Sequence, residues 1–299
     1  MLTIRKIIRV FLVPPLVKSN SVNVLRTVFV PAAWPNQSRH HSTVYPRVRG
    51  MGSPAVSAAA RHLVVFDFDQ TIVDVDTYTT VAQMAPLRGH ALPEQLATAP
   101  KREGWVEYIH AILQFNYANK ITSEEIRMKL QSLPLVPGMP ELLEYLRANR
   151  LRLYDTVILS DANMCFIQWI LEKFRLSDCF LRVFSNPAEV DEKGHLLVGR
   201  YHEQTDCQLS PKNMCKGRVL QEWMAERERV TGIAYESVYY VGDGENDLCP
   251  GKRLTARDIF FVRRDFPLAR KLVESPDVQC AVELWSDGFD VMKRLKELG

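Results

Sequence analysis

Short apolar runs that suit buried strands alternate along the chain with longer segments of helical periodicity. The four runs are His62–Phe66, Thr156–Leu159, Val238–Val241 and Ile259–Val262. Runs of this length with so few polar residues are typical of strands buried on both faces, as in parallel sheets covered by helices. The alternation of strand and helix therefore predicts an α/β fold built on a Rossmann-like parallel sheet.

The segments between the runs show the patterns of helices. Apolar residues recur at helical spacing in Gly104–Tyr117, Met139–Ala148 and Ala162–Phe174. Thr122 and Glu125 have the spacing of a capping box, in which two side chains satisfy free N–H groups at the start of a helix. We therefore expect helices at these places.

A long insertion separates the first two expected strands. It has about eighty residues, from Asp74 to Asp155, and most of them have helical patterns. A single crossover between neighbouring parallel strands needs far fewer residues. We therefore expect a small helical cap domain at residues 76–155 and a core formed by residues 61–75 and 156–299.

The first sixty residues have the composition of a leader. Residues 1–66 hold nine of the 38 Lys and Arg residues and none of the 35 Asp and Glu residues. An amphipathic, Arg-rich and acid-free start is typical of a mitochondrial transit peptide. The alternatives are that residues 1–60 form a disordered extension, or that translation starts at Met51 and skips the residues before it. We therefore expect a cytoplasmic or mitochondrial protein.

The composition of the remaining chain excludes several classes of protein. Residues 67–299 hold 29 basic and 35 acidic residues, and this mildly acidic balance argues against a nucleic-acid partner. No stretch of 18 apolar residues occurs, so no membrane span is predicted. The six cysteines lack the density of a disulfide framework, which favours free thiols. The sequence leaves the oligomeric state open.

Polar clusters follow three of the four expected strands. They are DFDQT at 67–71, SDAN at 160–163 and GDGEND at 242–247. Ligands of doubly wound sheets bind outside the carboxyl ends of the strands. We therefore expect the three clusters to converge on one crevice.

This convergence predicts a metal site. Asp67, Asp69, Asp243 and Asp247 would place four carboxylates together, and their repulsion calls for a cation. Carboxylate oxygens together with substrate phosphate are the ligands that Mg²⁺ prefers, whereas zinc favours the thiols and imidazoles that these clusters lack. The expected cofactor is therefore Mg²⁺.

With a metal and a phosphate in place, the same clusters allow phosphoryl transfer. One carboxylate can attack phosphorus, and a second, two residues further on, can exchange protons with the leaving oxygen and with water. Ser160 can bind phosphate through its hydroxyl, and a helix expected to begin near Asp161 offers backbone N–H groups. Lys216 is the best-placed cation.

The order and spacing of DFDQT, Ser160, Lys216 and GDGEND resemble the four motifs of the haloacid dehalogenase superfamily. The resemblance implies that Asp67 is the nucleophile and that Asp69 is the general acid and base. It implies an aspartyl-phosphate intermediate during hydrolysis of a small phosphomonoester.

The same resemblance implies how the ligands are held. Mg²⁺ is expected at the Asp67 side chain, the Asp69 backbone carbonyl and Asp243, with Asp247 in support. Phosphate is expected to contact Ser160, Lys216 and Asn246.

Further segments resemble the PHOSPHO family, whose members act on phosphoethanolamine and phosphocholine or on pyridoxal 5′-phosphate. They are FDFDQTIVD at 66–74, LSDAN at 159–163, SNP at 185–187, PKNMCK at 211–216 and YVGDGENDLCP at 240–250.

One departure from the family pattern concerns the substrate. Tyr78 stands where the amine-handling pattern carries an acid, and an aromatic ring at the mouth of the site can stack on a pyridine ring. Asp76 and Asp161 remain as expected contacts of the substrate. The favoured substrate is therefore pyridoxal 5′-phosphate, followed by the amine esters.

Two alternatives stay open at this point. One is a phosphoserine-type phosphatase for another metabolite, and the other is a non-catalytic protein that binds a phospholigand on the same fold. The thiols of Cys207 and Cys215, with His202 nearby, are interpreted as structural rather than as a metal site, and Cys249 as a packing residue.

Overall fold

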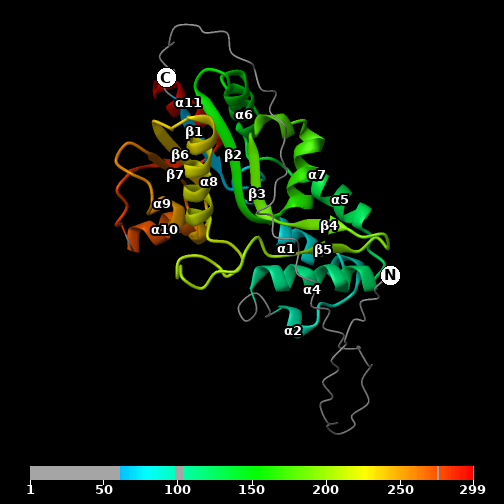
Figure 1. Ribbon diagram of the computed structural model, residues 1–299. Coiled ribbons are helices and arrows are strands. Elements are labelled where there is room, and N and C mark those ends of the chain that lie inside the picture. Colours follow the sequence, from blue (N-terminus) through cyan, green and yellow to red (C-terminus); the bar gives the residue numbers. More distant parts are fainter. Residues whose placement is uncertain (1–60, 98–103, 275, 299) are drawn as a thin grey trace, which may run out of the picture. The chain divides into compact units, whose positions relative to one another are not determined.

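The computed structural model describes residues 61–97, 104–274 and 276–298. Six parallel strands form one sheet in the order β3-β2-β1-β6-β7-β8, and helices cover it (Figure 1). The strands are β1 (His62–Phe66), β2 (Tyr154–Asn163), β3 (Arg182–Asn186), β6 (Ser237–Gly242), β7 (Ile259–Arg263) and β8 (Ala281–Trp285). The predicted α/β fold with a parallel sheet is confirmed. The leader predicted at 1–60 lies outside the described residues.

Apolar side chains on both faces of the sheet build two separate cores. In β1, Leu63 and Val65 point into one core, and Val64 and Phe66 point into the other, because successive side chains of a strand alternate between faces. The first core lies under α8 (Lys216–Thr231), α9 (Leu248–Gly251) and α10 (Pro267–Glu274). The second lies under α6 (Met139–Ala148), α7 (Met164–Phe174) and α11 (Gly288–Leu298).

The insertion after β1 forms a group of helices beside the sheet. Its helices are α1 (Thr77–Ala82), η1 (Pro86–Arg88), α2 (Glu94–Ala97), α4 (Trp105–Ala118) and α5 (Ser123–Gln131). The short hairpin of β4 (Ala188–Val190) and β5 (Leu196–Val198) contacts α4 and α7, and Figure 1 shows it beside α4.

The last part of the insertion differs from the expected cap. α6 packs against α11 and β2, and its Leu142, Leu143 and Leu146 are buried in the core of the sheet. It therefore serves as the crossover helix of the core. We propose a cap that ends before α6, rather than at residue 155 as expected from the length of the insertion.

Helix starts show how local sequence fixes the geometry. The capping box at the start of α5 is confirmed, because Thr122 accepts from the Glu125 N–H and Glu125 accepts from the Thr122 N–H. The predicted helix start near Asp161 is wrong. β2 continues to Asn163, and this side chain caps α7 by accepting from the Phe166 N–H at 3.1 Å. Asn at this position favours a helix that begins at Met164, three residues later than expected.

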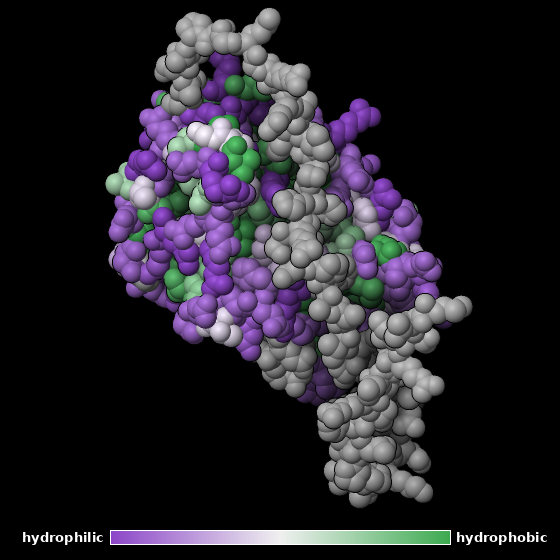
Figure 2. Space-filling model, in the orientation of Figure 1, coloured by the Kyte–Doolittle hydropathy of each residue, from purple (hydrophilic) through white to green (hydrophobic). Residues whose placement is uncertain are grey.

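One face of the molecule can be followed in a space-filling view (Figure 2). On the face in Figure 2, hydrophilic residues predominate and hydrophobic ones are scattered among them. No helix in the described ranges has the length and apolar character needed to cross a membrane.

Candidate active site

Asp67 lies at the end of β1, where the strand delivers it to the carboxyl edge of the sheet. Its backbone N–H donates to the Val241 carbonyl of β6, which fixes the start of the loop. The side chain is nearly buried, and its Oδ1 accepts from the Phe68 N–H at 2.7 Å. Its second oxygen, Oδ2, lies 2.7 Å from Lys216 Nζ. Asp67 is therefore held in a fixed orientation from both sides.

Lys216 joins two of the predicted clusters. It is the first residue of α8, it is fully buried, and its Nζ lies 2.7 Å from both Asp67 and Asp247. Burial alone would lower the pKa of Lys216, but the charges of Asp247, Asp67 and Asp161 raise it above its ordinary value. A permanent positive charge therefore faces the predicted nucleophile.

Three carboxylates gather around this cation. Oxygens of Asp67, Asp243 and Asp247 lie within 4.8 Å of one another. Burial and the charges of Asp67 and Asp247 raise the pKa of Asp243 to about 8, and burial and the charge of Asp67 raise the pKa of Asp247 to about 7. An excess of buried negative charge with hard oxygen ligands fits a divalent cation.

The two aspartates of the GDGEND loop differ in how many partners they have. Asp247 accepts four hydrogen bonds, from Lys216, from the Tyr240 hydroxyl and from the N–H groups of Asp243 and Gly244. Asp243 accepts one from Thr71 Oγ1 at 3.2 Å. Asp243 is therefore freer to bind a metal directly, whereas Asp247 shapes the loop.

Gly242 makes this loop possible. A Cβ at this position would lie 2.4 Å from Asp247 Oδ2, well inside van der Waals contact. The first glycine of the motif therefore leaves room for the carboxylate that organises the loop.

Asp69 has a different environment from Asp67. Its Oδ2 accepts from Thr77 Oγ1 at 2.9 Å, while its buried Oδ1 has no hydrogen-bond partner within the described residues. Burial, followed by the charges of Asp76 and Asp67, raises the pKa of Asp69 well above its usual range. This shift favours the protonated form of the carboxyl group, which can donate a proton to a leaving oxygen.

The cluster on β2 is linked to the GDGEND loop and to the loop before α8 through Asp161. The carboxylate of Asp161 accepts from Asn246 Nδ2 at 2.8 Å and from Asn213 Nδ2 at 2.9 Å. Ser160 is buried and its Oγ accepts from the Ala162 N–H at 3.2 Å. Asn246, which was expected to contact phosphate, donates a hydrogen bond to Asp161. The segment at Asp161 is extended, so it does not offer the N–H groups of a helix start that were expected there.

All the predicted site residues except Lys216 and Asp247 line one cavity of about 730 Å³. Its other walls come from the three motif clusters and α9, from the cap, from the loop before α8 and from α10. They are Gln70, Trp105, Ala162, Gln208, Leu209, Pro211, Gly244, Glu245, Leu248, Pro267 and Lys271.

Asp76 and Tyr78 bring α1 of the cap to this cavity. Asp76 caps α1 by accepting from the Thr79 N–H, and it lines the cavity. Tyr78 is only 4% exposed, its hydroxyl donates to the Asp161 carbonyl at 3.3 Å, and its ring meets Phe166 edge-on. Tyr78 is thus more deeply embedded than its expected place at the mouth, whereas Trp105 is 44% exposed.

Sequence reasoning missed the residues that support the clusters. Arg263, at the end of β7, donates to the Gln70 carbonyl at 2.6 Å and pairs with Asp74, so it holds the loop after β1. Tyr240 and Thr71 orient Asp247 and Asp243. Tyr240 lies in an apolar strand and Thr71 lies in the DFDQT cluster, so neither position shows a distinct pattern in the sequence. Arg263 does show one, because it ends an otherwise apolar strand.

A sequence model of the family described as Putative Phosphatase matches residues 62–298, which include every predicted site residue. The chain belongs to this family. The predicted relationship to the PHOSPHO group of haloacid dehalogenase-type phosphatases is confirmed.

Two kinds of curated relative cover most of the chain. Pyridoxal phosphate phosphatase PHOSPHO2 of Bos taurus is 35% identical over 240 residues, which are 79% of this chain and 98% of that protein. Phosphoethanolamine/phosphocholine phosphatase of Homo sapiens is 32% identical over 253 residues, 83% of this chain and 92% of that protein. The chain is therefore a phosphatase.

The fold has solved counterparts. A substrate-bound phosphoserine phosphatase aligns with a TM-score of 0.51 and 18% identity, over 78% of this chain and 98% of that one. At this identity the likeness concerns the fold, and it agrees with the parallel sheet described above.

Proposed function

We propose that this protein is a Mg²⁺-dependent phosphomonoesterase that transfers phosphate to Asp67 and then to water. The observation that carries the proposal is the pairing of Asp67 with Lys216 at 2.7 Å, beside the carboxyl group of Asp69, whose pKa burial raises well above its usual range. This arrangement supplies a nucleophile held beside a cation, and a second carboxyl group two residues away that can act as the proton donor.

In the first step, a carboxylate oxygen of Asp67 forms a bond to phosphorus and the ester P–O bond breaks. Asp69 gives its proton to the leaving oxygen, so the product departs as an alcohol. In the second step, Asp69 takes a proton from water, and the water oxygen attacks phosphorus. Inorganic phosphate leaves and the carboxylate of Asp67 is restored. Lys216 stays charged throughout and keeps Asp67 in place.

The residues present fit Mg²⁺. The side chains of Asp67 and Asp243 and the backbone carbonyl of Asp69 would hold the ion, with Asp247 orienting the GDGEND loop. When bound, Mg²⁺ offsets negative charge on the phosphoryl group. The cluster contains carboxylates and no thiol or imidazole, which supports Mg²⁺ over zinc.

We propose pyridoxal 5′-phosphate as the preferred substrate. An exposed aromatic side chain, Trp105, lines the cavity together with Leu209, so a flat pyridine ring has a surface on which to stack. The relatives named pyridoxal phosphate phosphatase support the same choice. Tyr78 then acts as a support for the cavity wall through its contacts with Asp161 and Phe166.

A second candidate is a phosphorylated amine. Asp76, Asp161 and Glu245 line the cavity, and a cationic ammonium group would be attracted to them. The relatives named phosphoethanolamine/phosphocholine phosphatase support this candidate.

Phosphate release from pyridoxal 5′-phosphate, phosphoethanolamine, phosphocholine and phosphoserine separates these candidates. We expect the highest kcat/KM for pyridoxal 5′-phosphate, loss of activity in EDTA, and recovery with added Mg²⁺. Full activity in EDTA would contradict the metal requirement. A higher kcat/KM for an amine ester would make the second candidate the preferred substrate class.

A variant in the cap tests the aromatic surface. Trp105→Ala should lower kcat/KM for pyridoxal 5′-phosphate relative to phosphoethanolamine by roughly 3- to 10-fold, the worth of one aromatic contact. Tyr117→Ala is the matched control, because Tyr117 lies on the same helix with similar exposure and does not line the cavity. Equal ratios in wild type and Trp105→Ala would remove Trp105 from the substrate site.

A further inference from the structure

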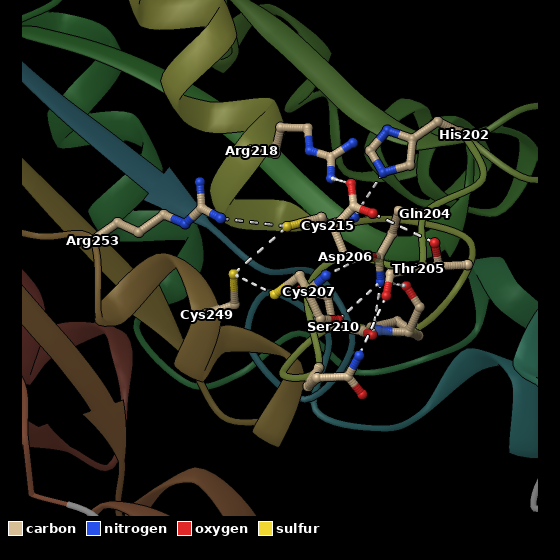
Figure 3. Close-up of polar contacts among 12 residues, drawn as sticks. His202, Gln204, Thr205, Asp206, Cys207, Ser210, Cys215, Arg218, Cys249 and Arg253 are labelled. Carbon is tan, nitrogen blue, oxygen red and sulfur yellow. Dashed lines mark hydrogen bonds and ion pairs between the residues drawn. The ribbon is translucent and has the colours of Figure 1, made fainter.

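Three cysteines from separate elements meet beside the active site. Cys207 lies in the loop before α8, Cys215 is the N-cap residue of α8, and Cys249 is in α9. Cys249 Sγ lies 3.4 Å from Cys207 Sγ and 3.7 Å from Cys215 Sγ, and all three sulfur atoms fall within 4.8 Å of one another (Figure 3). We call these residues the thiol cluster.

The thiol cluster differs from the other cysteines of the chain. Cys165 and Cys179 belong to one apolar core and Cys280 to the other, where they pack against hydrophobic side chains. The three members of the thiol cluster belong to neither core, and they contact one another. Packing therefore explains the positions of Cys165, Cys179 and Cys280. It does not explain why the three members of the thiol cluster converge.

We propose that Cys207, Cys215 and Cys249 bind one thiophilic d¹⁰ cation of the Zn²⁺ class, with the fourth ligand position open to water. Sulfur atoms that share a tetrahedral zinc at about 2.3 Å are roughly 3.8 Å apart, close to the spacing found here. A disulfide would use two of the thiols, whereas a metal uses all three. Thiolate ligands favour Zn²⁺ over Mg²⁺, so this site is chemically distinct from the carboxylate site.

The surroundings match the charge of such a complex. Three thiolates around one divalent cation carry a net charge of −1, and Arg253 Nη2 lies 3.9 Å from Cys215 Sγ. The Cys215 N–H donates to His202 Nε2 at 2.9 Å, which holds the backbone of the ligand in place (Figure 3). Hydrogen bonds to the residues next to a ligand orient it and strengthen metal binding.

A bound metal would restrain one wall of the substrate cavity. The loop that carries Cys207 also supplies Gln208, Leu209 and Pro211 to the cavity, and Gln204 ties this loop together by donating to the carbonyls of Cys207, Ser210 and Pro211. The metal would fasten the loop to α8 and α9. Occupancy of the thiol cluster should therefore affect KM more than kcat.

Titration of the full-length, reduced and metal-free protein tests the site, with Co²⁺ as the optical probe and Zn²⁺ as competitor. We expect a thiolate-to-cobalt charge-transfer band that saturates at one equivalent per chain and is abolished by one equivalent of Zn²⁺. Cobalt bound only to carboxylates gives no such band, so the Mg²⁺ site does not interfere. Cys207→Ser and Cys249→Ser should each lose the band, and Cys280→Ser, the matched control, should keep it.

Several results would overturn the proposal. They are the absence of the band in folded wild-type protein, its persistence in the Cys207→Ser, Cys249→Ser double variant, or its loss in Cys280→Ser. A titration that counts four free thiols instead of six in protein purified without reductant, with no bound zinc, would replace the metal site by a disulfide. Circular dichroism of each variant shows whether a lost band reflects lost ligands or lost structure.

Discussion

The carboxyl group of Asp69 lies where burial and neighbouring negative charges favour its protonated form. Thr77 from the first cap helix reaches it, so the acid is positioned by the cap as well as by the core. Asp67, two residues earlier, has Lys216 beside it instead. Two identical side chains thus have different surroundings, with a cation beside Asp67 and with burial and neighbouring negative charge around Asp69.

Asp69→Asn should lower kcat by about 10²- to 10⁴-fold, the usual worth of a general acid. The loss should be smaller for substrates with good leaving groups, such as p-nitrophenyl phosphate, because they depart without a proton. Steady-state kinetics with both kinds of ester measure the difference. An equal loss for both kinds of substrate would contradict the role of proton donor.

At the level of single residues, the sequence was sufficient to predict which aspartates meet. DFDQT and GDGEND each follow a recognisable buried strand, so the edge of the sheet brings them together. Arg263 and Tyr240 were not predictable, because their partners lie on other elements at distances that only the folded chain sets. The same reason hid Cys249, which meets Cys207 only after α9 is placed beside α8.

Among the elements, long and strongly apolar strands were predictable and short or exposed ones were not. β8 is an edge strand whose residues are mostly exposed, and the hairpin of β4 and β5 has only three residues in each strand. Such segments have too little apolar pattern to stand out. α6 was assigned to the cap because its amphipathic pattern does not reveal which surface it packs against.

Asp155 joins strand β2 to helix α8 and to the segment before β1, at the opposite end of the sheet from the active site. It is the second residue of β2, it is buried, and it pairs with Arg61 before β1 and with Arg227 of α8. The Tyr235 hydroxyl donates to it at 2.7 Å. Burial would raise the pKa of Asp155, but Tyr235, Arg227 and Arg61 together lower it.

Asp155→Asn should therefore reduce the free energy of unfolding by about 3 kcal/mol at pH 7, since it leaves buried arginine charge unpaired. A depressed pKa in the folded state stabilises the protein above the unfolded-state pKa of about 4, and the contribution is lost as pH falls through the folded-state value. The difference in free energy of unfolding between wild type and variant, measured by urea denaturation, should shrink in acid.

Asp178→Asn provides the control for this prediction. Asp178 pairs with Arg147 at an exposed site, so its loss should change stability little at either pH. A difference for Asp155→Asn that is the same at pH 7 and in acid would contradict the electrostatic explanation.

For the molecule as a whole, the family domain at residues 62–298 holds almost all of the described residues, which are 61–97, 104–274 and 276–298. The catalytic clusters, the cavity and both cores are formed within it. We propose that residues 1–60 act in targeting to mitochondria and contribute nothing to catalysis.

Deletion of residues 1–60 should leave kcat and KM unchanged within about twofold, because no predicted site residue lies there. A fluorescent fusion of the full chain should enter mitochondria, whereas the fusion of the shortened chain should stay in the cytosol. Insoluble or inactive shortened protein would show that the segment belongs to the folded domain. Cytosolic fluorescence of the full chain would contradict the targeting role.

The central claim is that phosphate passes through Asp67, and chemical trapping of the intermediate tests it most directly. Enzyme mixed briefly with substrate and Mg²⁺ is quenched and treated with borohydride, which reduces an acyl phosphate to an alcohol. Mass spectrometry of the digested protein should then find homoserine at position 67, and Asp67→Asn, with turnover lowered by on the order of 10⁴-fold or more, should give none. Reduction at another residue, or turnover without any trapped intermediate while Asp67→Asn stays active, would contradict the account.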